Sequence, residues 1–333
     1  MTAGRSDADD MMRSPKTTPI TAADLPVGGD RRIYHLQLQP EQLAPNILLV
    51  GDPGRALLIA ETFFDETECE VFNRGLRTVT GRVKQTGLRV SVVTSGMGTA
   101  SVEIVLQELV ALNEIDFDTR LPKSAFEPLH LIRVGTSGGL QPNTKLGTPI
   151  ISTYSIGMDN TALFYDAPPT DSNCVHLEQL VAAAMLDEMQ PQARFRGRIQ
   201  PYASKADADM VAALEAGAEE LGVTVETGIT VSNSGFFCNQ GRDITRVPPS
   251  VPEIDKIFTR LDPKLEGMRF ENLEMETSFL FFFAAALGYK AGAICVTAAN
   301  RELNTFAEDY QQGVKDATAV ALRALEQLRK ESA

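Results

Sequence analysis

One apolar run of this chain contains an arginine and is followed at once by small polar residues. Arg133 lies in the run 129–134, directly before the Gly/Ser/Thr segment 135–139. An arginine is unusual in a run that has the character of a buried strand. Its forked guanidinium suits a phosphate, and the hydroxyls and N–H groups of a Gly-rich turn can complete the shell around the anion. The segment has neither the Walker pattern GxxxxGK[ST] nor the dinucleotide pattern GxGxxG. It therefore predicts a phosphate site of another kind.

Two further glycine turns stand between an apolar run and a helical pattern. They are Gly51-Asp52-Pro53-Gly54-Arg55 and Ser95-Gly96-Met97-Gly98-Thr99. A turn that opens a helix leaves backbone N–H groups unpaired, and these can bind an anion. Taken alone, the first turn is more typical of an ordinary strand-to-helix connection, so the motif needs support from its surroundings.

A polar loop after the run 224–232 contains the groups needed to hold a flat heterocycle. Phe236 and Phe237 could stack on its face, while Gln240 and Arg242 could bond to its edge. The alternative, a surface loop with two packing phenylalanines, stays open at this point.

Two carboxylates precede the most apolar helix that the sequence predicts. Glu274 and Glu276 stand in an acidic turn before the expected helix 277–287, which a short strand at 293–296 follows. Burying a carboxylate is costly unless it is paired or binds something. The two residues could bind a ligand, or they could be solvated residues that favour the start of a helix. The segment alone does not decide between these alternatives.

Alternating strands and helices must position these groups, which indicates an α/β fold with a largely parallel central sheet. The remaining expected strands are 46–50, 76–83, 88–94 and 148–154, and the remaining expected helices are 56–64, 100–112, 175–189, 206–221 and 305–330. Residues 1–30 are rich in Ser, Thr, Asp, Pro and Gly and predict a mobile tail. Residues 31–333 then form one catalytic domain.

Composition excludes several classes of function. The net charge of −13 argues against nucleic acid as a partner. No apolar run is long enough to span a bilayer, and the first residues do not form a secretory signal. Four widely spaced cysteines predict reduced thiols, a cytoplasmic protein and no zinc site.

Seven motifs in order resemble the nucleoside phosphorylase family, which includes uridine phosphorylase and the hexameric bacterial type of purine nucleoside phosphorylase. They are YHLQL at 34–38, GDPGR at 51–55, NRGLRTVTG at 73–81, SGMGTAS at 95–101, IRVGTSGG at 132–139, FFCNQGR at 236–242 and LEMETS at 273–278. The resemblance covers the chain from about residue 31 to the C-terminal helix. It implies a single α/β domain whose central mixed sheet forms a distorted barrel flanked by helices.

The resemblance also implies roles for individual residues. The phosphate shell of one subunit would consist of Gly51, Arg55, Arg133 and Thr136. Arg74 would reach the phosphate site of a neighbouring subunit, with Arg77 as the alternative, and His35 would cross the same interface toward the ribose. The ribose contacts would be Met275 and Glu276, assisted by Glu274, and the base contacts would be Phe236, Gln240, Arg242, Thr136, Ser137 and Gly138. Arg242, Gln240 and Arg133 would be the catalytic residues.

The choice of base depends on two segments. Gln240-Gly241-Arg242 matches the uridine-cleaving branch, whereas residues 297–300 lack the aspartate that protonates a purine in the other branch. The expected activity is therefore the reversible phosphorolysis of uridine in pyrimidine salvage, with deoxyuridine and thymidine left open. A purine or broad-specificity phosphorylase and a non-catalytic nucleoside-binding protein are the alternatives.

The resemblance implies phosphate as a co-substrate and no metal or organic cofactor. A structural monovalent cation, known in some members, is left open. The active sites would be shared within a homodimer, alone or as part of a trimer of dimers.

Overall fold

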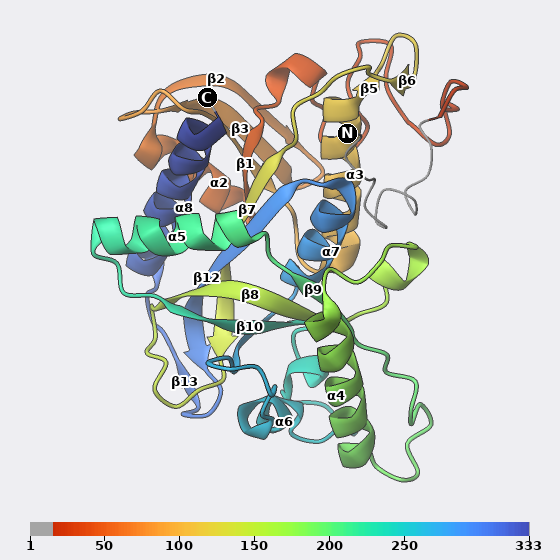
Figure 1. The fold of residues 1–333 in the computed structure, drawn as a ribbon, viewed down its shortest axis with the longest axis vertical. Helices are drawn as coiled ribbons and strands as arrows, with labels where there is room; N and C mark the ends of the chain where they lie inside the picture. Colours follow the sequence, from red (N-terminus) through yellow and green to blue (C-terminus); the bar gives the residue numbers. More distant parts are fainter. Residues whose placement is uncertain (1–15, 333) are drawn as a thin grey trace, which may run out of the picture.

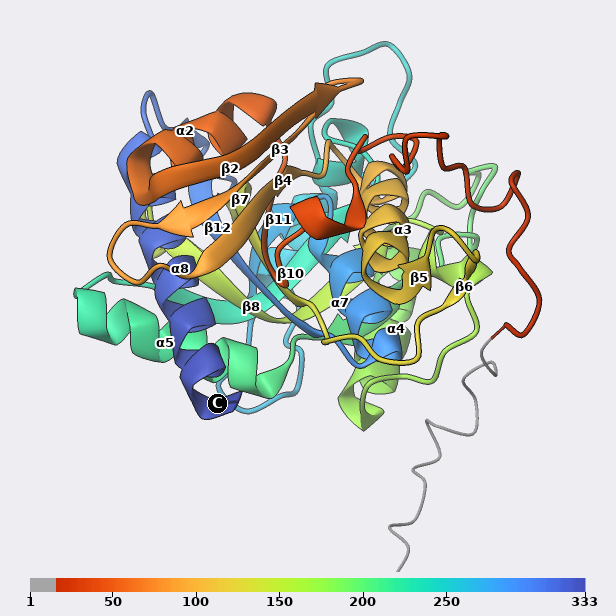
Figure 2. The ribbon, with the colours of Figure 1, turned by 90° about the horizontal axis from the view of Figure 1, so that it is seen from above.

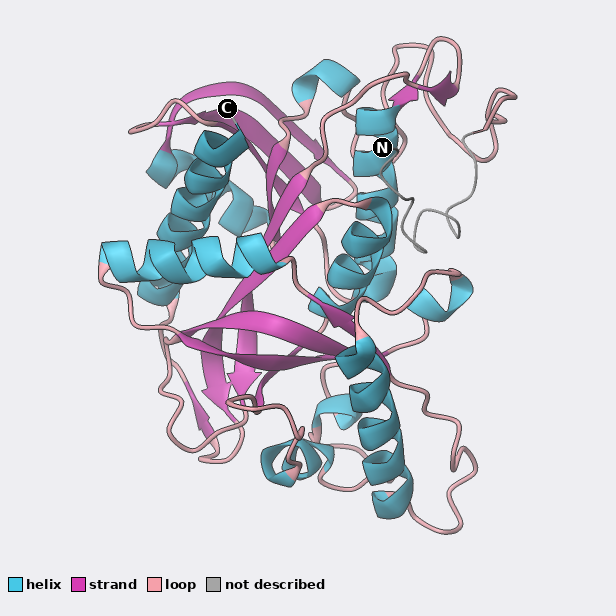
Figure 3. Ribbon diagram, viewed as in Figure 1, coloured by secondary structure: helices cyan, strands magenta, loops and turns pink. Residues whose placement is uncertain are grey.

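The computed structural model describes residues 16–332 and contains one large mixed sheet with helices around its outside (Figures 1 and 3). The sheet has eleven strands. They are β1 (Asn46–Val50), β2 (Phe64–Asn73), β3 (Leu76–Val83), β4 (Arg89–Thr94), β7 (His130–Gly139), β8 (Pro149–Met158), β9 (Tyr202–Lys205), β10 (Glu226–Asn233), β11 (Phe270–Glu274), β12 (Lys290–Asn300) and β13 (Thr305–Phe306). A separate two-stranded ribbon consists of β5 (Ile115–Asp116) and β6 (Leu121–Pro122).

Five of the strands close into a barrel. Their order is β12-β8-β10-β11-β7, and β7 also pairs with β12. Three junctions of this ring are parallel and two, β11–β7 and β12–β8, are antiparallel. The expected single α/β domain with a mixed, barrel-forming sheet is confirmed. The sheet continues from β7 through β1, β4, β3 and β2, which form an arm beside the barrel.

Seven α-helices cover the sheet in the described part of the chain. They are α2 (Pro53–Phe63), α3 (Thr99–Glu114), α4 (Ser172–Glu188), α5 (Ala208–Leu221), α6 (Ile254–Arg260), α7 (Thr277–Leu287) and α8 (Gln311–Ser332). Seen from above, α5 and α8 lie on one side of the barrel, and α3 and α7 lie on the other (Figure 2). Three clusters of buried apolar side chains fill the spaces between helices and sheet. No helix among the described residues is long and apolar enough to cross a membrane.

The helix α7 has the limits that its sequence predicts. It is apolar on almost every face, and Phe279, Leu280 and Phe281 are fully buried. Gly288 ends the helix in the left-handed conformation (φ +71°), where its N–H bonds back to the last turn. The first residues of the helix thus lie directly after the end of β11.

Several expected boundaries were wrong, among them those of the strand at 293–296, which is the longer β12 (Lys290–Asn300). The segment 135–139 is not a turn, because β7 stays paired with β12 as far as Gly139. Glu274, which was expected in an acidic turn, is instead the last residue of β11, and this strand pairs in parallel with β10. The final helix begins at Gln311 rather than Thr305, because Thr305 and Phe306 pair with the end of β12. Pairing with a strand far along the chain overrides the local pattern at β7 and β11, and a short hairpin with the preceding β12 does so at Thr305 and Phe306.

The segment 16–30, which belongs to the expected mobile tail, contacts the domain at several points. Leu25 is buried. Arg120 donates from Nε to the carbonyl of Ile20 at 2.6 Å and from Nη2 to that of Thr21 at 2.8 Å. A few apolar residues and one arginine fix this segment without any regular period. The remainder of the expected tail, residues 1–15, lies outside the described residues.

Candidate active site

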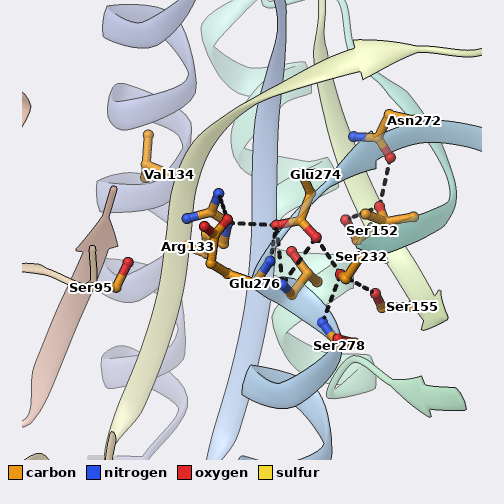
Figure 4. Close-up of polar contacts among 12 residues, drawn as sticks. Ser95, Arg133, Val134, Ser152, Ser155, Ser232, Asn272, Glu274, Glu276 and Ser278 are labelled. Atoms are coloured by element: carbon orange, nitrogen blue, oxygen red, sulfur yellow. Dashed lines mark hydrogen bonds and ion pairs between the residues drawn. The ribbon is translucent and has the colours of Figure 1, made fainter. Parts of the chain in front are cut away.

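Arg133 on β7 is buried, and two carboxylates lie beside its guanidinium (Figure 4). Its Nε lies 2.9 Å from Oε2 of Glu274, and its Nη2 contacts Oε2 of Glu276. Gly135 makes room for this guanidinium, because a Cβ there would lie 2.8 Å from Nη2. Nη1 is buried without a hydrogen-bond partner among the described residues. One nitrogen of this guanidinium, Nη1, therefore remains available to a ligand.

Glu274 and Glu276 are not solvated helix-start residues, because they are only 3% and 4% exposed. Glu274 accepts the N–H groups of Glu276 at 2.9 Å and Thr277 at 3.1 Å, as well as the hydroxyl of Ser232. Glu274 thus holds the start of α7 in place. Glu276 accepts the N–H of Gly98 at 2.6 Å, which joins α7 to the turn before α3.

The electrostatics of Glu276 follow from this arrangement. Burial raises the pKa of its carboxyl, and repulsion from Glu274 adds to that effect, while Arg133 opposes it. The Cβ direction of Gly98 points to Cε of Met275, at 3.8 Å. Met275 and Glu276, both predicted ribose contacts, therefore meet the same glycine turn.

Two of the predicted phosphate residues, Arg55 and Arg133, lie near one another beside β7. Asp52 caps α2 by accepting the N–H of Gly54 at 3.0 Å. This cap places Arg55 in the first turn, where its Nη1 lies 3.3 Å from the carbonyl oxygen of Val134. Burial lowers the pKa of Arg55, and the nearby Arg133 lowers it further. Two guanidiniums that repel one another form a corner suited to an anion.

Hydroxyl groups near the ends of β4 and β7 lack partners. Thr94 Oγ1 at the end of β4 and Ser137 Oγ on β7 are both buried and unbonded within residues 16–332. Thr136 beside them is partly exposed. Gly51 approaches the other glycine turn, since a Cβ on it would lie 3.5 Å from the carbonyl of Gly96. The geometry therefore brings Arg55 and Arg133 near one another, while the phosphate-binding roles of Gly51, Arg55, Arg133 and Thr136 stay predictions.

The loop after β10 brings its aromatic and polar residues together. Arg242 Nη1 donates to Gln240 Oε1 and to the carbonyl of Phe236, both at 2.7 Å. Its guanidinium lies over the Phe236 ring, 3.9 Å from the centroid. Gln240 is buried, whereas Phe236 and Phe237 are half-exposed. The loop is therefore more than a surface connection that packs two phenylalanines.

Arg301 and Asp255 belong to the same region, and the sequence interpretation missed both roles. Arg301 packs on Gly138, where a Cβ would lie 3.4 Å from its Cγ. Burial lowers the pKa of Arg242 to about 10, and Arg301 adds to this while Asp255 opposes it. The sequence indicated a role for Arg301 only through its position, because this residue directly follows the segment 293–300, which is mostly apolar. For Asp255 the sequence offers no such signal.

His35 and Arg74 lie close to one another on a surface apart from the residues around Arg133 and Arg242. The carbonyl of His35 accepts from Asn73, the neighbour of Arg74, at 2.8 Å. His35 Nδ1 lies 2.7 Å from Glu108, and Arg74 bonds to the hydroxyl of Tyr34 at 2.6 Å. Arg77 instead pairs with Glu70 on its own hairpin. The two predicted interface residues share one surface, and Arg74 is the more exposed arginine.

Comparisons with known proteins agree with this architecture. Residues 45–326 match the model of the phosphorylase superfamily. A uridine phosphorylase of Thermococcus kodakarensis is 30% identical over 307 residues, which cover 92% of this chain and 90% of that protein. A DeoD-type purine nucleoside phosphorylase of Streptococcus uberis is 27% identical over 294 residues, covering 87% and 97%. The crystal structure of a Trypanosoma brucei nucleoside phosphorylase, described as showing uridine phosphorylase activity, superposes with a TM-score of 0.83 at 29% identity and covers 91% and 100%.

The chain therefore belongs to the phosphorylase superfamily. Within it, the chain is an enzyme of the nucleoside phosphorylase type, a pentosyltransferase.

Proposed function

We propose that this enzyme is a uridine phosphorylase, which converts uridine and phosphate reversibly into uracil and ribose 1-phosphate. The observation that carries the proposal is the charge around the candidate base site. Arg242 and Arg301 lie close enough to repel one another, with Gln240 beside them. No acid stands at 297–300. Such a site favours a base that leaves as an anion over one that must be protonated.

The end of β12 adds to this argument. Asn300 is buried, and its Nδ2 donates to the carbonyls of Gln141 and Thr144, both at 2.8 Å. Ala298 and Ala299 are also buried. These residues cannot give a proton to a purine ring. Uracil, in contrast, departs as a delocalised anion that guanidinium and amide donors stabilise.

The phosphate end would perform the other half of the reaction. Arg55 and Arg133 hold phosphate with help from Gly51 and Thr136, and Glu276 and Met275 hold the ribose above it. The C1′–N1 bond breaks first, its electron pair stays on the base, and the sugar becomes oxocarbenium-like. A phosphate oxygen then bonds to C1′. Positioning accounts for much of the rate, because the attack becomes intramolecular in effect.

A partner subunit would complete the site. Arg74 would reach phosphate and His35 the ribose of the neighbouring copy, with Glu108 fixing the His35 ring through Nδ1. We therefore propose a homodimer as the smallest active unit. Sedimentation combined with assay would test this, and a fully active monomer would contradict it.

The direct test is base release from uridine, deoxyuridine, thymidine, inosine and adenosine, with and without phosphate. We expect uracil to be released from uridine only when phosphate is present. The change in absorbance between the nucleoside and the free base would measure this release. Release of hypoxanthine or adenine at a comparable rate would favour a purine or broad-specificity enzyme. Binding of nucleoside without turnover in phosphate would favour a non-catalytic protein.

A further inference from the structure

Asp255, near the start of α6, is a buried carboxylate directly beside the candidate base site. It is 5% exposed, and its Oδ2 lies 3.1 Å from Nη2 of Arg301. The Nε of Arg301 is buried and has no partner among the described residues. The ion pair therefore fixes one end of this guanidinium and leaves another donor available.

The same carboxylate packs against the backbone of the loop that carries Gln240 and Arg242. A Cβ on Gly241 would lie 2.2 Å from Asp255 Oδ1 and 2.8 Å from its Cγ. Gly241 also has a φ of +75°, a conformation that favours glycine. Two independent constraints thus require a glycine here, and one of them is the position of Asp255.

Asp255 also offsets the repulsion between two like charges. The positive charge of Arg301 lowers the pKa of Arg242, and the negative charge of Asp255 raises it. Two guanidiniums and one carboxylate leave this end of the site with a net charge of +1, which complements a departing base that carries −1. Without the carboxylate, repulsion would drive the guanidiniums apart and toward solvent.

We propose that Asp255 is a positioning residue that holds Arg301 beside the Gln240–Arg242 turn in the geometry required to stabilise the leaving base. This inference rests on the proposed function, because it assigns Arg301 and Arg242 to the leaving group. The only side chain with which Asp255 forms an ion pair in the described part of the chain is Arg301, so the proposal requires its effect on turnover to pass through Arg301.

A neighbouring ion pair provides a matched control. Lys256 Nζ lies 2.7 Å from Glu302 Oε2, so consecutive residues of α6 pair with consecutive residues after β12. The outer pair is about one-third exposed, whereas the Asp255 carboxylate is buried. Glu302→Gln should therefore weaken the same connection between elements without changing the charge beside Arg242.

The test is a double-mutant cycle on kcat/KM for uridine, with Asp255→Asn, Arg301→Met, both together, and Glu302→Gln. We expect Asp255→Asn and Arg301→Met each to lower kcat/KM by roughly tenfold to a hundredfold, with the KM for phosphate within about twofold of wild type. The double variant should match Arg301→Met alone, because Asp255 acts through that residue. Glu302→Gln should match wild type.

Three outcomes would overturn the proposal. They are wild-type kcat/KM in Asp255→Asn, effects that multiply in the double variant, and an equal loss in Glu302→Gln. If Asp255→Asn does not fold because Arg301 is left buried and unpaired, the double variant, which removes both charges, still gives the comparison with Arg301→Met. A wild type that cleaves another nucleoside refutes uridine as substrate, and the cycle is then measured with that nucleoside.

Discussion

Arg133 and Arg242 are both guanidiniums of the candidate site, but the chain supports them in different ways. Arg133 lies on a central barrel strand and is paired with two buried carboxylates. Arg242 lies in a loop, where its partners are a carbonyl, an amide oxygen and the face of a half-exposed ring. The phosphate end of the site is thus part of the protein core, whereas the base end lies in a loop outside the core.

This difference separates stability from specificity. A change at Arg133 alters the charge balance of the barrel itself, because Glu274 and Glu276 would lose their counterion. A change at Arg242 leaves the barrel intact and affects what the loop can bind. The four predictions below test that separation, beginning with the largest expected effect.

Replacing Arg133 should damage both the fold and the reaction. We expect Arg133→Ala to lower the free energy of unfolding by about 3–5 kcal/mol, because two buried carboxylates remain without a cation. The KM for phosphate should rise strongly in whatever protein folds. Denaturant unfolding and phosphate kinetics would measure the two effects. Arg133→Lys, which keeps the charge but not the fork, should recover more stability than phosphate use. A wild-type KM for phosphate in both variants would refute the assigned role.

Replacing Arg242 should abolish uridine turnover while the protein stays folded. Arg242→Ala removes a loop side chain, so we expect the free energy of unfolding to change by no more than about 0.5–1 kcal/mol. Phosphate binding should persist, which calorimetry can measure. Arg246→Ala, in the same loop and exposed, is the matched control and should retain activity. Unchanged turnover in Arg242→Ala would eliminate the base-recognition role.

The sequence predicts the local features at both ends of the site and misses the long-range ones. The apolar run 277–287 and the run 46–50 have limits that their own residues define. The arginine in an apolar strand and the glutamates before a buried helix are noticeable because each is locally costly. That Arg133 and Glu274, 141 positions apart, satisfy one another is set by the order of strands in the barrel.

The pair Asp255–Arg301 shows why part of the site stays hidden in the sequence. An aspartate near the start of a helix is common and locally favourable, so nothing marks Asp255 as buried. Its contact with Gly241 depends on how the loop after β10 folds back over α6. In the sequence, a charged residue that the fold buries in an ion pair cannot be distinguished from one on the surface.

Glu276 should contribute to binding at a cost in stability. Burial and Glu274 raise the pKa of its carboxyl, so the folded state binds a proton more readily than the unfolded state does. The stability contribution of such a carboxyl falls as pH rises from its unfolded pKa through its folded pKa. Glu276→Gln should therefore reduce turnover while the free energy of unfolding at pH 8 is unchanged or higher. The difference from wild type should shrink as the pH falls toward about 4.

Glu274→Gln is the matched comparison for this prediction. Glu274 accepts from Arg133, from Ser232 and from two backbone N–H groups, so its loss should destabilise the protein. Unfolding curves of the two variants across pH would separate a carboxylate held for ligand from one held for structure. Equal destabilisation by both would show that this distinction is wrong.

The smallest expected effect concerns the ring under Arg242. Phe236→Leu keeps the apolar volume and the carbonyl that accepts from Arg242, and removes only the aromatic face. A partly exposed cation–π contact contributes about 0.5–1 kcal/mol, so kcat/KM for uridine should fall roughly two- to fivefold. Phe237→Leu is the control, because that ring is similarly exposed and packs edge-on against Phe236 with centroids 5.3 Å apart. It should lose less. Equal losses would mean that the loop depends on packing between its two aromatic rings and not on the single ring beneath the guanidinium. The base end would then be held together by side-chain packing, as the core is, although its rings are half-exposed.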